Sequence, residues 1–133
     1  MIKRIDHIAV VVEDIEQALS LFRDTLGLEL SHTETIPEQG VKIAFLPVGE
    51  SEIELLEPLS ADTSIAKFLA KRGEGMHHIC LEVEDIDAAL ADLKEKGVRL
   101  INKTAVAGAH GRVAFIHPKS THGVLIELLE RSK

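Results

Sequence analysis

The sequence has few of the residues that mark disulfide-rich or nucleic-acid-binding proteins. Cys80 is the single cysteine, which excludes an intramolecular disulfide and fits a reducing cytoplasm. Trp and Tyr are both absent, so there is no obvious aromatic platform for stacking. The 15 Lys and Arg residues are outnumbered by 22 Asp and Glu residues, giving a net charge of −7. This balance argues against nucleic acid as a partner, because phosphate binding requires clustered positive charge.

Long hydrophobic runs are also lacking. None approaches the ~20 residues of a membrane-spanning helix, and no basic and apolar leader precedes the first apolar segment. We therefore expect neither membrane insertion nor secretion. The chain has 133 residues, of which 45% are hydrophobic and 28% charged, as in one globular domain over residues 1–133.

What the sequence does contain is an internal repeat. Residues 4–15 read RIDHIAVVVEDI and residues 75–86 read GMHHICLEVEDI, with His, Ile, Val, Glu, Asp and Ile in matching places. The string IELLE occurs at 53–57 and again at 126–130. Two copies of one folding unit explain both matches. The sequence predicts one module at about 4–59 and another at about 75–130.

Each module is predicted to contain a strand, a helix and three further strands. Asp14 and Asp85 are expected to cap the helices, and Gly27 and Gly97 to end them. A connecting helix is expected over 64–71. The strands are expected, by their apolar and β-branched content, at 5–12, 28–33, 41–47, 51–57, 77–83, 98–104, 112–117 and 123–129.

Two βαβββ modules, each too small to cover its own sheet, would pack together into one α+β domain. We expect a curved, cup-shaped mixed sheet with helices on its outer face. Two ferredoxin-like halves with a different strand order fit the same pattern.

Alternation along four strands places acids and histidines on the face opposite the aliphatic residues. Ile8, Val10 and Val12 share one face of the first strand, and His7 lies on the other. The same reasoning separates His78, Glu54 and Glu127 from the aliphatic residues of their strands.

These four residues are candidate metal ligands. A strand histidine alone is usually structural, and a strand glutamate often faces water. Two of each at equivalent repeat positions favour a shared divalent ion such as Co²⁺, Mn²⁺, Ni²⁺, Zn²⁺ or Fe²⁺. His77 is expected to be structural, and Cys80 to be a packed thiol.

The sequence resembles the vicinal oxygen chelate superfamily and, within it, the methylmalonyl-CoA epimerase family. The matching strings are DHIAVVVEDI near the start, PEQGVKIAF at 37–45, IELLEPL at 53–59, GMHHICLEVEDI at 75–86 and GAHGRVAFIHPKSTHGVLIELLE at 108–130. Together they cover nearly the entire chain.

The resemblance implies an isomerase that removes and returns the α-proton of (R)- and (S)-methylmalonyl-CoA through a metal-stabilised enolate. It implies a CoA thioester substrate, a cytoplasmic homodimer and a divalent metal, with Co²⁺ placed first and Mn²⁺, Ni²⁺ or Zn²⁺ next. It points to Glu38 as an acid/base residue. The implied metal ligands are His7, Glu54, His78 and Glu127. Glu54 departs from members that have Gln at this position, and its added negative charge would alter metal preference.

Three other functions use similar residues. A glyoxalase I-type lactoylglutathione lyase would share the metal and the enediolate chemistry. An extradiol dioxygenase would use two His and one carboxylate on Fe²⁺, and a fourth ligand at Glu54 argues against it. A non-enzymatic drug-binding module would need no metal, whereas this chain keeps all four donors.

Overall fold

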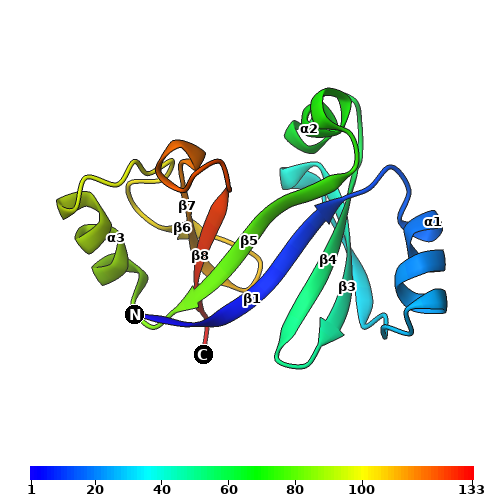
Figure 1. Cartoon of the computed structure of the whole chain (residues 1–133), viewed down its shortest axis with the longest axis horizontal. Helices are drawn as coiled ribbons and strands as arrows, with labels where there is room; N and C mark the ends of the chain where they lie inside the picture. The colour runs from blue at the N-terminus through cyan, green and yellow to red at the C-terminus, as the bar shows by residue number, and fades with distance from the viewer. The chain divides into compact units, whose positions relative to one another are not determined.

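The computed structural model describes all residues, Met1–Lys133, and contains eight strands that follow the predicted order (Figure 1). The first module comprises β1 (Ile2–Val11), α1 (Ile15–Leu19), β2 (His32–Ile36), β3 (Val41–Val48) and β4 (Ser51–Pro58). Helix α2 (Ser64–Arg72) connects the modules. The second comprises β5 (Gly75–Val83), α3 (Ile86–Glu95), β6 (Val106–Ala107), β7 (Gly111–Ile116) and β8 (Ile126–Arg131).

The chain divides into two units, and β1 and β5 each contribute to both. Residues Ile8–His77 form the N-terminal unit, and Met1–His7 with His78–Lys133 form the C-terminal unit. The units therefore differ from the sequence modules. The first residues of β1, up to His7, belong to the C-terminal unit, and the first residues of β5, up to His77, belong to the N-terminal unit. That the chain behaves as one domain, with modules at 4–59 and 75–130, stays a prediction.

In the N-terminal unit the strand order is β2-β3-β4-β1, and β3 pairs antiparallel with both of its neighbours. One face of this sheet packs on Ile15 and Leu19 of α1, and the packed strand residues include Leu46 and Leu55. The opposite face packs on Ile65 of α2 through Val11, Ile43, Phe45 and Leu56. Ile53 and Leu55, which alternate with Glu54 along β4, thus lie beneath α1.

In the C-terminal unit the order is β1-β5-β8-β7-β6, with β5 and β8 parallel and β7 antiparallel to β8. Helix α3 covers one face, where Ile86 and Leu90 pack against Val83, Ala114 and Leu128. Leu81 and Ile126 pack against the same cluster. The opposite face is left for polar side chains.

The predicted helix caps are present. Asp14 accepts a hydrogen bond from Gln17 N at 3.1 Å, and Asp85 accepts one from Ala88 N at 3.1 Å. Gly27 and Gly97 both have φ +79°, the left-handed conformation that ends a helix and that glycine adopts without strain.

The helix expected between Asp14 and Gly27 is not α-helical throughout, because α1 ends at Leu19. It continues as a π-helical turn, Ser20–Thr25. The Thr25 hydroxyl donates to the Ser20 carbonyl, so this carbonyl has a side-chain partner and the turn widens.

Two strands lie elsewhere than predicted. The strand expected at 28–33 begins at His32, because Leu28 and Leu30 pack into the α1 core without joining a ladder. The strand expected at 98–104 is replaced by β6 at Val106–Ala107. The Asn102 side chain there accepts the Phe115 N–H at 2.8 Å, which a strand partner would otherwise take.

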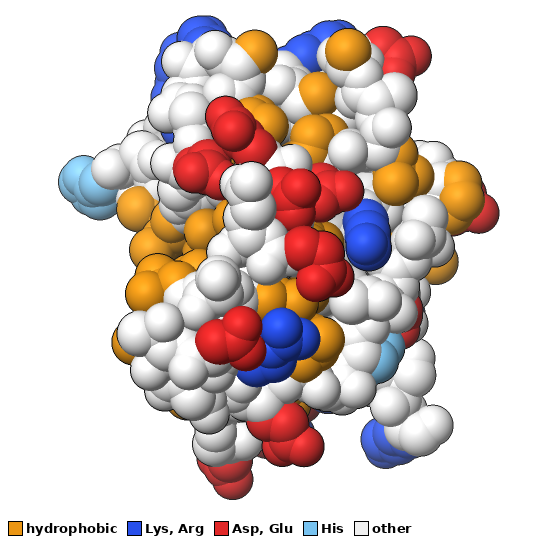
Figure 2. Space-filling model, turned by 90° about the vertical axis from the view of Figure 1, so that its right-hand side faces the viewer, with side chains coloured by type: hydrophobic (Ala, Val, Ile, Leu, Met, Phe, Trp, Pro, Cys, Tyr) orange, Lys and Arg blue, Asp and Glu red, His pale blue; other side chains and the backbone are white.

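Acidic residues dominate part of the surface. Figure 2 shows Asp and Glu side chains gathered across the middle of the face that carries α1. On α1 and the turn that continues it, Glu16 and Asp24 are exposed. Phosphate groups are repelled by such a face.

None of the helices has the length and apolar character needed to cross a membrane.

Candidate metal centre

Three of the four predicted ligands lie together on neighbouring strands of the C-terminal unit. His7 is on β1, His78 on β5 and Glu127 on β8. Because β5 and β8 pair in parallel with Cys80 opposite Glu127, the strand register brings Glu127 close to His78. The histidines are only 7% and 8% exposed, so water is largely excluded from them.

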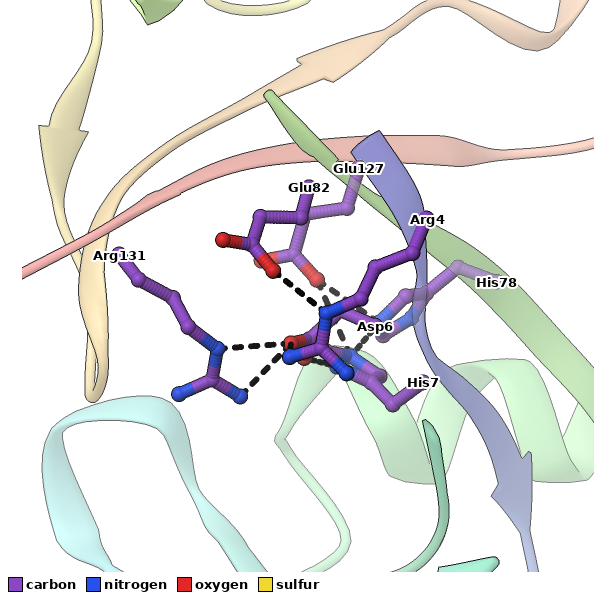
Figure 3. Close-up of polar contacts among 7 residues, drawn as sticks. All are labelled: Arg4, Asp6, His7, His78, Glu82, Glu127 and Arg131. Atoms are coloured by element: carbon purple, nitrogen blue, oxygen red, sulfur yellow. Dashed lines mark hydrogen bonds and ion pairs between the residues drawn. The ribbon is translucent and has the colours of Figure 1, made fainter. Parts of the chain in front are cut away.

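The three donor atoms form a nearly equilateral triangle (Figure 3). The Nε2 atoms of His7 and His78 are 3.2 Å apart, and Oε1 of Glu127 is 3.3 Å from the first and 3.1 Å from the second. Ligands held about 2.1 Å from an ion are separated by about 3.0 Å in octahedral and about 3.4 Å in tetrahedral geometry. The triangle therefore fits one face of the coordination shell of a small divalent cation.

The charge of the site also suits a cation. Burial raises the pKa of Glu127, but hydrogen bonds from His7 and His78, together with their positive charge, outweigh it and lower this pKa to about 2. Glu127 is thus a carboxylate at neutral pH, and its oxygen is available as an anionic ligand.

Asp6, which sequence reasoning missed, contacts the other nitrogen of His7. Its Oδ2 accepts a hydrogen bond from His7 Nδ1 at 2.8 Å, and Asp6 is 1% exposed. Burial raises the pKa of Asp6, but hydrogen bonds from His7 and Arg131 lower it below its usual value. A carboxylate behind a ligating imidazole is a common feature of metal sites. The Asp-His pair at residues 6–7 was the available signal.

Glu54 lies in the N-terminal unit. It is on β4, 6% exposed, and its register partner on β3 is Phe45. Glu127 is likewise opposite Phe115 on β7, and the Phe115 ring packs edge-on to His78 with centroids 5.7 Å apart. The two modules thus place Glu and Phe equivalently. Coordination by Glu54 stays a prediction.

Glu38 is exposed in a single 3₁₀ turn, Pro37–Gln39, that follows β2. Gly40 ends this turn with φ +66°, and a Cβ atom added there would clash with the Thr63 side chain. The turn therefore requires glycine. The acid/base role of Glu38 stays a prediction.

Two other residues have structural contacts. Cys80 is fully buried, and burial raises its pKa to about 12 despite a hydrogen bond with His7, so its thiol is neutral. His77 packs edge-on to Phe68 of α2, with ring centroids 4.9 Å apart.

Comparison with known proteins places this geometry in a family. The sequence profile of the Glyoxalase/Bleomycin resistance protein/Dioxygenase superfamily matches residues 6–115. Over 127 residues the chain is 47% identical to a mitochondrial methylmalonyl-CoA epimerase of Mus musculus, covering 94% of this chain and 71% of the mouse protein. The chain belongs to the methylmalonyl-CoA epimerase family of this superfamily.

Two further epimerases extend the similarity over almost the complete chain. An ethylmalonyl-CoA/methylmalonyl-CoA epimerase of Cereibacter sphaeroides is 45% identical, covering 96% of this chain and 98% of that protein. A solved methylmalonyl-CoA epimerase in complex with methylmalonyl-CoA and NH4+ is 42% identical, with a TM-score of 0.90, covering 99% of this chain and 96% of that one. The predicted family and the glyoxalase-like α+β fold are confirmed.

Proposed function

We propose that this chain is an isomerase that interconverts (R)- and (S)-methylmalonyl-CoA by removing and returning the α-proton. Membership of the epimerase family supports the reaction, and the solved relative binds methylmalonyl-CoA. The observation that carries the proposal is the triangle of His7 Nε2, His78 Nε2 and Glu127 Oε1. It offers a cation site on the polar face of the sheet.

The substrate explains why such a site is needed. Its α-carbon lies between a thioester and a carboxylate, so deprotonation produces negative charge on the thioester oxygen. A bound divalent cation supplies positive charge that stabilises this oxygen without any redox change. His7, His78 and Glu127 would hold the cation, with Glu54 as the proposed fourth ligand.

Inversion at carbon is simplest with a proton-transfer group on each side. We assign one role to Glu38, as general base in one direction and general acid in the other. Its support is the family resemblance of the PEQGV string together with its exposed carboxylate, which is accessible to a substrate. The second group remains open between Glu127, through its other oxygen, and a water molecule.

The mixed nitrogen and oxygen donors suit borderline divalent ions, among which we propose Co²⁺, with Mn²⁺, Ni²⁺ and Zn²⁺ as substitutes. We further propose a homodimer in the cytoplasm. The family resemblance supports the dimer, and the free Cys80 suits a reducing compartment.

The test is exchange of the α-proton in deuterated water. Purified protein is incubated with methylmalonyl-CoA, with and without a chelator, and the α-proton signal is followed by NMR. We expect exchange that the chelator abolishes and Co²⁺ restores. Glu38→Gln should slow exchange by about 10²- to 10⁴-fold, because an amide cannot accept the proton.

Glu29→Gln is the matched control, since Glu29 is an exposed acid outside the site. With this variant the α-proton of the substrate should exchange at the same rate as with the unmodified chain. If fully metallated protein shows no exchange, the epimerase assignment is wrong. Turnover of a glutathione hemithioacetal instead would identify the lyase alternative.

A further inference from the structure

The two oxygens of Asp6 have different partners (Figure 3). Oδ1 accepts from Arg131, with Nε at 2.9 Å and Nη2 at 2.7 Å. Oδ2 accepts from His7 Nδ1 at 2.8 Å. Arg4 approaches Oδ1 only at 3.4 Å and makes its short contact, 2.7 Å, with Glu82. Arg131 thus occupies one oxygen and leaves the other for the histidine.

This division has a consequence for His7. A carboxylate only accepts hydrogen bonds, so the proton of the ring must be on Nδ1 where Asp6 faces it. The Nε2 atom, which points at His78 and Glu127, can then present a lone pair. A metal requires that lone pair.

We propose that Asp6 and Arg131 are positioning residues that set the protonated nitrogen of His7, and so prepare its Nε2 to bind the cation. The inference rests on the metal site proposed above. Arg131 is suited to its part because it lies on β8 four residues after Glu127, on the same face of the strand. Strand β8 therefore supplies the ligand Glu127. It also supplies Arg131, which orients Asp6 behind the second ligand, His7.

Asp6→Asn is expected to move the ring proton of His7 to Nε2 and so to weaken metal binding. In the variant, Arg131 would hold the single carbonyl oxygen, because a guanidinium has only donors. The amide NH₂ would then face His7 Nδ1 and donate to it, which moves the ring proton to Nε2. Removing Arg131 as well frees the amide to turn its oxygen toward His7.

The experiment measures Zn²⁺ affinity by calorimetry for the unmodified chain, Asp6→Asn, Arg131→Met and the double variant. We expect Asp6→Asn to weaken binding about 10- to 100-fold. The double variant should bind more tightly than Asp6→Asn alone. Arg4→Met is the control and should change affinity by no more than about twofold, because its contact with Asp6 is long. Unchanged affinity in folded Asp6→Asn, or a double variant no tighter than it, would overturn the proposal.

A second measurement needs no metal. Long-range ¹H–¹⁵N NMR, with the His7 signal assigned by its loss in His7→Ala, should show a proton on Nδ1 of the unmodified chain, whether or not Nε2 also carries one. Asp6→Asn should lose it. An unprotonated Nδ1 in the unmodified chain contradicts the proposal even if Asp6→Asn does not fold. Failure of the unmodified chain to bind Zn²⁺ would instead reject the metal site, and the NMR result would still decide the role of Asp6.

Discussion

At the scale of single residues, the surroundings of Glu127 strongly lower the pKa of its carboxyl group. Its side chain is 13% exposed and lies within 3.3 Å of two histidine nitrogens. In metal-free protein, hydrogen bonds from these nitrogens lower the pKa of the carboxyl by more than burial raises it. Its pKa of about 2 in the folded chain compares with an ordinary 4.5.

This difference predicts acid sensitivity of the metal-free chain. Because the pKa is lowered on folding, the stabilisation is fully present above pH 4.5 and is lost as pH falls toward about 2. Its size is on the order of 3 kcal/mol. Urea unfolding of chelated protein across this range should show it, and Glu127→Gln should flatten the profile. The exposed Glu16→Gln control should not, and an unchanged profile in Glu127→Gln would contradict the explanation.

Strand alternation together with the internal repeat predicted His7, His78 and Glu127, because an aliphatic residue directly follows each of them and points to the opposite face, and the repeat places a matching residue in the other module. Asp6 could not be found this way. It is adjacent to His7, so alternation assigns it to the opposite face, and its contact with Arg131 joins residues 125 positions apart. The Asp6–Arg131 contact depends on the assembled sheet and leaves no local pattern.

At the scale of elements, the second glutamate of each IELLE string supports a helix. Glu57 accepts a hydrogen bond from Ile15 N at 2.8 Å, at the start of α1. Glu130 accepts one from Ile86 N at 2.9 Å, at the start of α3. The first N–H groups of a helix lack intrahelical partners, and a carboxylate there also complements the helix dipole. The sequence showed the repeated string but not this partner, since each pair is more than 40 residues apart.

Glu57→Ala and Glu130→Ala should each lower the free energy of unfolding by about 1 to 2 kcal/mol, because each leaves a helix N–H without its acceptor. Urea denaturation measures this loss. Replacement by Gln should cost less, since the amide oxygen still accepts. Glu50→Ala, in the exposed turn after β3, should change stability by no more than about 0.5 kcal/mol. Equal losses in all three alanine variants would contradict a capping role.

At the scale of the whole molecule, the duplicated sequence distributes its candidate ligands unequally. His7, His78 and Glu127 all belong to the C-terminal unit, and Glu54 belongs to the N-terminal unit. The repeat predicted one imidazole and one carboxylate per module. In space, the exchange of β1 residues gives the C-terminal unit both imidazoles. Under the coordination by Glu54 proposed above, a bound cation would also stabilise the N-terminal unit.

That role predicts how metal binding changes amide hydrogen exchange. Zn²⁺ at about 100 times its Kd stabilises the binding-competent chain by about 2.7 kcal/mol, which slows coupled exchange about 100-fold. In the unmodified chain we expect slowing in β5 and β8 and also in β3 and β4. Glu54→Ala should remove the effect from β3 and β4 while β5 and β8 keep it, because their own three ligands remain. Glu52→Ala, two residues earlier on β4, should behave as the unmodified chain does. If metal never slows exchange in β3 and β4, Glu54 is not a ligand, and the cation belongs to the C-terminal unit alone.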